Sequence, residues 1–244
     1  SGRVTGVQTC ALPISLYDRN YEDSNVSYGT RDDSAIVSYV KQTYQLFAAS
    51  MLAAAVGSYV GMPFAAAIAA NYWFIVIPWI LFAWFGFPIV KHKAGINMVA
   101  LFAWTFASGV IITPLLTHVL SMSGGASIVA NAFLMTAVTF GGLSLFAMKS
   151  AKDYTPFGKP LIIAVIVVIV FSLVNMFIFQ SPIFHVLLSG GVFLIFSFLT
   201  VVDTQNIIQG NFETPMDGAI QLYLDFLNMF TALLQIFGFM NSDD

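Results

Sequence analysis

Seven long apolar segments, each about as long as a bilayer is thick, constrain the fold of this 244-residue chain more than any other feature. They lie at residues 42–62, 71–90, 96–118, 127–148, 160–180, 183–207 and 218–240. A helix of about 20 apolar residues spans the hydrocarbon core of a membrane. Barrel strands would be about 10 residues long and would alternate in polarity, which these segments do not do. The sequence therefore predicts an all-α bundle of seven transmembrane helices in a lipid bilayer.

Composition and motif content argue against a soluble protein, a nucleic-acid-binding protein and an enzyme. Only 9% of the residues are charged, whereas a soluble domain carries about 25%. The Lys and Arg residues are scattered and form no basic stripe, so we expect no nucleic-acid partner. The chain has no GxSxG, HExxH or phosphate-loop motif and no Cys/His cluster. We therefore expect no enzyme, no catalytic residues and no cofactor.

The first 15 residues do not belong to the predicted fold. The stretch VTGVQTCALPI within them looks like the translation of a common sequencing adapter, and it contains Cys10, the only cysteine. We expect the native chain to begin near Ser15 or Leu16 and to have no disulfide. Residues 16–38 are polar and acidic and are predicted to form a largely disordered cytoplasmic arm. Residues 39–241 are then the seven-helix membrane domain.

Basic residues predict the orientation of the helices. With seven spans, every native Lys and Arg falls on one side of the membrane, in the arm or in the linkers after segments two and four. Basic loops stay in the cytoplasm. The N-terminus is therefore predicted to be cytoplasmic and the C-terminus external.

Two aspartates, Asp203 and Asp225, stand inside the last two apolar segments. An ionised carboxylate in hydrocarbon costs about 2.5–3.5 kcal/mol on insertion scales, so such a residue is a candidate functional site. The short linker 209–216 keeps segments six and seven adjacent, and both acids fall in the cytoplasmic half of the membrane. The two side chains are therefore predicted to meet.

Two carboxylates in one site of low dielectric constant cannot both ionise easily, so they are expected to share a proton and to titrate as a unit. A shared proton would hold segments six and seven together, and its loss would make them repel. A calcium ion could replace the proton, because carboxylate oxygens are its preferred ligands. Asp203 and Asp225 are thus the candidate gate and a possible calcium site. Intramembrane aspartyl proteases also use two aspartates, but their GxGD motif is missing here.

Segment seven carries a polar stripe that continues from Asp225. Gln221 lies four residues before Asp225, and Asn228, Thr231 and Gln235 follow it at spacings that place all of them on one helical face. Such a face is expected to line a polar interior, which makes segment seven the candidate central helix of the bundle. The alternative is a helix whose polar groups only hydrogen-bond to neighbouring helices.

Three further residues are candidates for a role in the gate or in a separate pH or metal site. Lys91 ends segment two at the depth of the aspartates and is a candidate third member of the gate, although a lysine there can also face lipid headgroups and set the topology. His118 and His185 flank outer loops and could form an external pH or metal site, but a lone histidine at a helix end is more often without such a role.

The end of segment six, VVDTQNII, and the segment-seven stretch AIQLYLDFLNMFTALLQIFG resemble the C-terminal signature of the Bax inhibitor-1 family, also called the transmembrane Bax inhibitor motif family. The run FASGVIITPLL in segment three is similar to that family too. The resemblance covers residues 35–241. It implies a seven-helix fold in which the seventh helix is surrounded by the other six.

The resemblance also implies a function. It points to a pH-sensitive calcium leak of the bacterial inner membrane, in which two aspartates, matching Asp203 and Asp225, form a proton-sharing latch. An arginine that bonds to this latch in the calcium-leak relatives corresponds to Lys91, whose point charge cannot form the same forked contact. Bacterial relatives are also described as modulators of a membrane-bound AAA protease, which is the alternative function. Some of them lack the second aspartate, so its presence here favours the leak.

Overall fold

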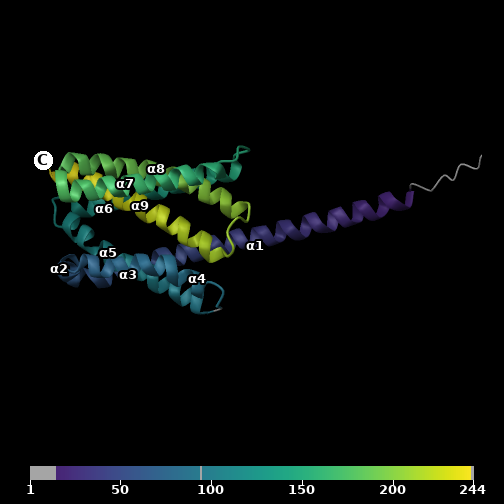
Figure 1. Cartoon of the computed structure of the whole chain (residues 1–244), viewed down its shortest axis with the longest axis horizontal. Coiled ribbons are helices and arrows are strands. Elements are labelled where there is room, and N and C mark those ends of the chain that lie inside the picture. Colours follow the sequence, from purple (N-terminus) through teal and green to yellow (C-terminus); the bar gives the residue numbers. More distant parts are fainter. Residues whose placement is uncertain (1–14, 94, 243–244) are drawn as a thin grey trace, which may run out of the picture. The chain divides into compact units, whose positions relative to one another are not determined.

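The computed structural model describes residues 15–93 and 95–242, with side chains described for residues 34–93 and 95–241. The chain divides between Ser38 and Tyr39 into two units, which are treated separately. Nine α-helices are assigned in the described residues (Figure 1): α1 Ser15–Gly61, α2 Ala65–Ala70, α3 Tyr72–Leu81, α4 Phe87–Val90, α5 Ile96–Leu120, α6 Gly125–Lys149, α7 Gly158–Val174, α8 Pro182–Ile208 and α9 Pro215–Ser242.

Seven helical segments in the described part of the chain are long and apolar enough to cross a membrane, as the sequence predicts. Short 3₁₀ and π turns join some of the helices, so that a span can contain more than one of them. The spans are Ser34–Ala70, Tyr72–Val90, Ile96–Leu120, Gly125–Lys149, Thr155–Phe179, Pro182–Ile208 and Pro215–Asn241. The protein is therefore an all-helical, multi-pass membrane protein.

The N-terminal unit differs from the prediction. Residues 16–38 were expected to be largely disordered, but α1 is already helical at Ser15. This stretch contains no proline and only one glycine, Gly29, so no residue in it forces the helix to end. The segment predicted to be an adapter translation, residues 1–15, lies outside the described residues except for Ser15.

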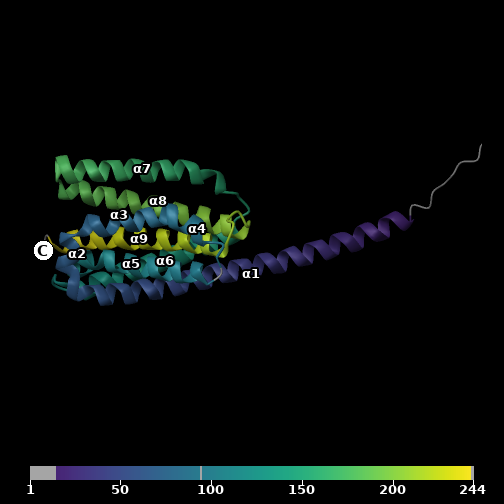
Figure 2. The ribbon, with the colours of Figure 1, turned by 60° about the horizontal axis from the view of Figure 1, so that its bottom comes forward.

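Within the second unit, α9 is the most buried span. Half of its most apolar window is buried, against 6–39% for the others. It packs on α5, α6 and α8, and Figure 2 shows it passing between these helices. Each of the three buried apolar clusters in the described residues contains side chains of α9, among them Tyr223, Phe226 and Leu234.

Small residues and two tryptophans determine how α1 and α3 pack against α5. Gly57 lies against the backbone of Phe106, and Gly109 lies against the backbone of Ala54, so α1 and α5 approach one another closely. Trp79 and Trp104 stack with ring centroids 4.5 Å apart, and each indole N–H donates to the other residue's carbonyl oxygen. The small residues of segment one thus serve close helix packing, as is usual in membranes.

Candidate functional site

Asp203 and Asp225 lie on α8 and α9, the two helices that share the most extensive interface of the bundle. Both are buried, with 9% of Asp203 and 2% of Asp225 exposed. Both therefore lie in the interior of the bundle, on two helices that pack on one another. The structure therefore buries the two acids that the sequence singles out, on neighbouring helices.

Neither aspartate forms an ion pair with a basic side chain in the described part of the chain. Asn206 donates one long hydrogen bond, 3.5 Å from its Nδ2 to Oδ1 of Asp203. Oδ2 of Asp225 is buried without any hydrogen-bond partner. A buried carboxylate in this situation costs free energy unless a proton or a cation neutralises it. The pair can therefore hold a proton or interact with a cation.

Thr200 and Thr204, on either side of Asp203 in α8, are both buried. Thr204 donates from Oγ1 to Oγ of Ser144 on α6, at 3.4 Å, and all of Thr200 is buried. No cluster of three or more His, Cys, Asp or Glu side chains occurs among the described residues. Calcium takes six to eight oxygen ligands in a dedicated site, and Asp203 with Asp225 supplies two carboxylates. The two aspartates alone therefore supply fewer ligands than a dedicated calcium site requires.

Gln205 anchors the end of α8 and was not singled out by the sequence. Its side chain is 5% exposed. Oε1 accepts a 2.6 Å hydrogen bond from the backbone N–H of Tyr154, and Nε2 donates a 2.8 Å bond to the carbonyl oxygen of Lys152. Gln205 thereby ties α8 to the loop between α6 and α7, two residues after Asp203. Its place directly after Asp-Thr is the only sequence signal that could have drawn attention to it.

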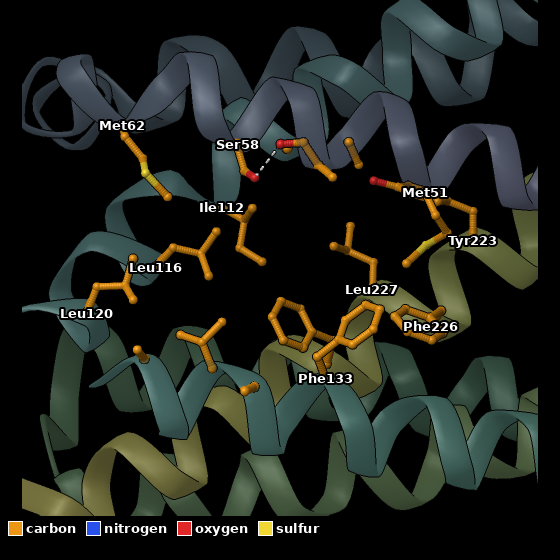
Figure 3. A pocket seen from close by; sticks show the side chains of 17 residues that line it. Met51, Ser58, Met62, Ile112, Leu116, Leu120, Phe133, Tyr223, Phe226 and Leu227 are labelled. Carbon is orange, nitrogen blue, oxygen red and sulfur yellow. Dashed lines mark hydrogen bonds between the residues drawn. The ribbon is translucent and has the colours of Figure 1, made fainter. Parts of the chain in front are cut away.

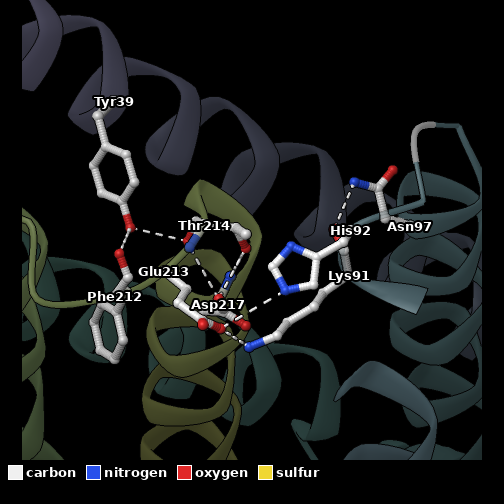
Figure 4. A network of polar contacts seen from close by, with 8 residues as sticks. All are labelled: Tyr39, Lys91, His92, Asn97, Phe212, Glu213, Thr214 and Asp217. Atoms are coloured by element: carbon white, nitrogen blue, oxygen red, sulfur yellow. Dashed lines mark hydrogen bonds and ion pairs between the residues drawn. The ribbon is translucent and has the colours of Figure 1, made fainter. Parts of the chain in front are cut away.

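Lys91 pairs with Glu213 and not with either aspartate, which corrects the expectation that it joins the gate. The Lys91 ammonium is bonded to Oε2 of Glu213, and Nε2 of His92 lies 3.9 Å from the same oxygen (Figure 4). This hydrogen bond raises the pKa of Lys91 and lowers the pKa of Glu213. The physical reason for the difference is the linker between α8 and α9, which places a carboxylate within closer reach of the lysine.

We call the Lys91–Glu213 ion pair the clasp, because it joins the end of α4 to the α8–α9 linker. The linker is also held from α1, since the Tyr39 hydroxyl is within hydrogen-bond distance of the carbonyl oxygens of Phe212, at 3.1 Å, and Thr214, at 2.9 Å (Figure 4). A cavity of about 460 Å³ lies beside Lys91, and its lining includes the amides of Gln42, Gln45 and Asn97. The clasp thus borders this cavity, which we call the vestibule and whose lining mixes polar and apolar side chains, at one end of the bundle.

The polar stripe of α9 is only partly covered. Gln221 is exposed and does not line an enclosed interior, because its neighbours Leu222 and Tyr223 occupy the buried face. Asn228 is half-buried and donates to the carbonyl oxygen of Leu224, at 2.8 Å. Gln235 is also half-buried and accepts a 2.7 Å hydrogen bond from Ser189 on α8. For Gln235 the structure therefore gives a contact between helices.

His118 and His185 are both exposed, and both line one cavity of about 230 Å³ at the other end of the bundle. Gln235 lines the same cavity. The structure therefore brings the two histidines to one place, although they come from α5 and α8.

Comparison with known proteins relates the chain to a family. A family model described as "Inhibitor of apoptosis-promoting Bax1" matches residues 36–242. An uncharacterized protein of Campylobacter jejuni is 49% identical over 237 residues, which cover 94% of this chain and all of the relative. An uncharacterized protein of Helicobacter pylori J99 is 41% identical over 232 residues, 95% of this chain and all of the relative. An uncharacterized membrane protein of Vibrio cholerae is 35% identical over 159 residues, 64% of this chain and 70% of the relative.

Proposed function

The chain belongs to the Bax inhibitor-1 family, and from that premise we propose that it is a pH-sensitive calcium leak channel of the bacterial inner membrane, gated by a proton that Asp203 and Asp225 share. The observation that carries the proposal is the burial of two neighbouring carboxylates without a basic partner in the described part of the chain. The family is not one of enzymes, so the pair is assigned to permeation and not to catalysis.

The gating step follows from electrostatics. With one proton between them, Asp203 and Asp225 carry a single negative charge and a hydrogen bond can join α8 to α9. When that proton leaves, two negative charges remain at short range in a poorly hydrated site. The repulsion favours separation of the helices, and calcium, as the permeant substrate, compensates the charge in passing.

We assign α9 as the central helix along which the ion passes. Its burial, its contacts with α5, α6 and α8, and the half-buried polar groups that follow Asp225 support this assignment. The vestibule beside the clasp lies at the end of the bundle where we propose that the ion enters. Gln221, which is exposed, has no part in this path.

The end of the bundle that carries the clasp is proposed to be cytoplasmic. The linkers after α4 and α6 lie at that end, because Lys91 binds the α8–α9 linker and Gln205 binds the loop after α6. These two linkers and the helix ends beside them hold five lysines, Lys91, Lys93, Lys149, Lys152 and Lys159, and basic loops remain in the cytoplasm. The C-terminus after the seventh span is then external.

Calcium flux into liposomes that contain only the purified protein tests the function. We expect the leak to be greater at pH 8 than at pH 6, by at most about 100-fold, because one titrating proton changes a population by no more than tenfold per pH unit. In the double variant Asp203→Asn, Asp225→Asn this pH dependence is expected to disappear. The control is Asp153→Asn, which changes an exposed loop aspartate held by Thr155.

An unchanged pH dependence in the double variant would refute the gate. A wild-type flux no greater than that of protein-free liposomes at every pH would refute the channel altogether. The alternative, an interaction protein that restrains a membrane-bound AAA protease, would then take its place. The separate N-terminal unit is the structural feature that favours this alternative. Deletion of residues 16–33 separates the two functions. It is expected to abolish binding to the protease and to leave the calcium leak unchanged, because the leak requires only the bundle.

A further inference from the structure

A second cavity, of about 480 Å³, lies within the membrane-spanning part of the second unit, away from the clasp. Its walls come from α1, α5, α6 and α9, and Figure 3 shows their side chains surrounding one open space. Cavities of about 300–1,000 Å³ are typical of sites for small molecules. This cavity is large enough for a ligand and is not part of the aspartate site.

The lining is almost wholly apolar, and its two hydroxyl groups already have partners. Ser58 donates from Oγ to the carbonyl oxygen of Ala55, at 2.9 Å (Figure 3). The Tyr223 hydroxyl is bonded to Ser108, behind the wall of the cavity. No charged side chain lines the space. A cavity of this kind offers too few polar partners to hold water or an ion, so its occupant is apolar.

Aromatic rings close the cavity at the end where Met51 lies. Phe133 and Phe226, which both line it, lie with ring centroids 5.6 Å apart. Phe226 in turn contacts Phe140, which stacks on Phe47 at 5.1 Å. Phe47 is on α1 and Phe140 is on α6, so these two helices are in contact at this ring pair. From there toward Met62, the cavity separates the two helices.

The cavity opens between α1 and α6. Its lining includes exposed residues from both helices, Ala55 on α1 and Ala126, Ala130 and Phe133 on α6. On the opposite side, the close approach of α1 and α5 at Gly109 closes the wall. Because these helices span the membrane, the opening faces hydrocarbon.

The length of the cavity matches one leaflet. It extends from Met51 on α1 to Met62, the first residue after that helix, which is about 16 Å at 1.5 Å per residue. That is half of a hydrocarbon core of about 30 Å. We propose that an acyl chain of a membrane phospholipid occupies this cavity, entering between α1 and α6 from the leaflet at the Met62 end. The absence of a basic residue from the lining favours a phospholipid chain over a free fatty acid, whose carboxylate would find no partner there.

Photolabelling of the full chain in liposomes tests this inference without reference to calcium flux. The probe is a phosphatidylethanolamine with a diazirine near the end of one acyl chain, and labelled peptides are identified by mass spectrometry. We expect labelling around Met51 and Phe226. Ala130→Phe is expected to lower this labelling by at least about fivefold, because its ring overpacks the space that the chain needs.

Leu134→Phe is the matched control, since it adds a ring to an exposed position of α6 outside the lining, and it should leave the labelling unchanged. Ala55→Phe fills the cavity from the opposite wall and replaces Ala130→Phe if that variant fails to fold. Equal labelling of cavity and lipid-facing peptides, insensitive to both filling variants, would overturn the proposal. Equally strong labelling by a diazirine fatty acid at the same mole fraction would overturn the choice of a phospholipid.

Discussion

Replacing Gln205 with methionine isolates the two hydrogen bonds that tie α8 to the loop after α6. Methionine keeps the length and approximate volume of the side chain, so the packing around a residue that is 5% exposed is largely preserved. The change removes the acceptor for the Tyr154 N–H and the donor for the Lys152 carbonyl oxygen. The variant therefore measures what this anchor contributes to the stability of the bundle.

The magnitude follows from the exposure of the two groups that lose their partner. A buried donor left unsatisfied costs about 1–3 kcal/mol, and a typical hydrogen bond has a net value of about 1 kcal/mol. Tyr154 is half-buried, so its N–H falls in the lower part of that range, whereas exposed Lys152 can turn its carbonyl oxygen to water. We expect a loss of about 2 kcal/mol in the free energy of unfolding. For a chain of this size that corresponds to a decrease in Tm of roughly 4–8 °C.

Thermal unfolding in detergent micelles, followed by circular dichroism, measures the effect. Gln209→Met is the matched control, because Gln209 is exposed and its two side-chain contacts, 3.4 Å from Nε2 to Asp153 and 3.1 Å from Asn211 Nδ2 to Oε1, are exposed as well. The control should lie within about 0.5 kcal/mol of the wild type. If Gln205→Met and Gln209→Met unfold at the same temperature, the anchor carries no net stability and the reasoning fails.

Two further predictions concern the clasp and the helix packing. Glu213→Gln removes the ion pair with Lys91, so we expect a greater calcium leak at pH 7 with an unchanged pH dependence between about pH 6 and 8. Liposome flux measures both quantities. A flattened pH profile would contradict the assignment of the pH response to the aspartates. Gly109→Ala would force a Cβ against the carbonyl oxygen of Ala54 and should cost about 1–3 kcal/mol in the free energy of unfolding. Gly141→Ala, with open space around its Cβ, should be neutral or stabilising by up to about 1 kcal/mol, and equal effects at the two glycines would refute the close-packing argument.

The seven spans could be predicted because the bilayer leaves few options. A helix must satisfy its own backbone within hydrocarbon, and its length is fixed by the thickness of the membrane. The predicted segments 96–118 and 183–207 thus agree closely with the spans Ile96–Leu120 and Pro182–Ile208. The N-terminal arm lacks such a constraint, and there the expectation of disorder was wrong because composition alone does not report a helix that continues from the first span.

The aspartates could be predicted as a neighbouring pair because the linker of α8 and α9 is short and their depths are similar. The partner of Lys91 could not be predicted. It depends on the path of the linker at residues 209–214, which brings Glu213 to the lysine. The exposure of Gln221 was not predictable either. The periodicity of segment seven shows which residues share a face, but it does not show which neighbouring helix covers that face.

The clasp also indicates where a pH response can reside. Because the pKa of Glu213 is held below its usual 4.5, the stabilisation from its ionised form is present above pH 4.5 and is lost as the pH falls through the lowered value. Because the pKa of Lys91 is raised above 10.5, its contribution is present below pH 10.5 and is lost only as the pH rises through the raised value.

Both partners of the clasp therefore remain charged between pH 6 and pH 8. Asp153, whose pKa is lowered by hydrogen bonds from Thr155, also keeps its charge in this range. Histidine is the other residue type whose charge commonly changes in this pH range. A pH-dependent leak must then come from the buried aspartates or from a histidine. The double aspartate variant distinguishes these origins, because a response that depends on histidine survives the loss of both carboxylates.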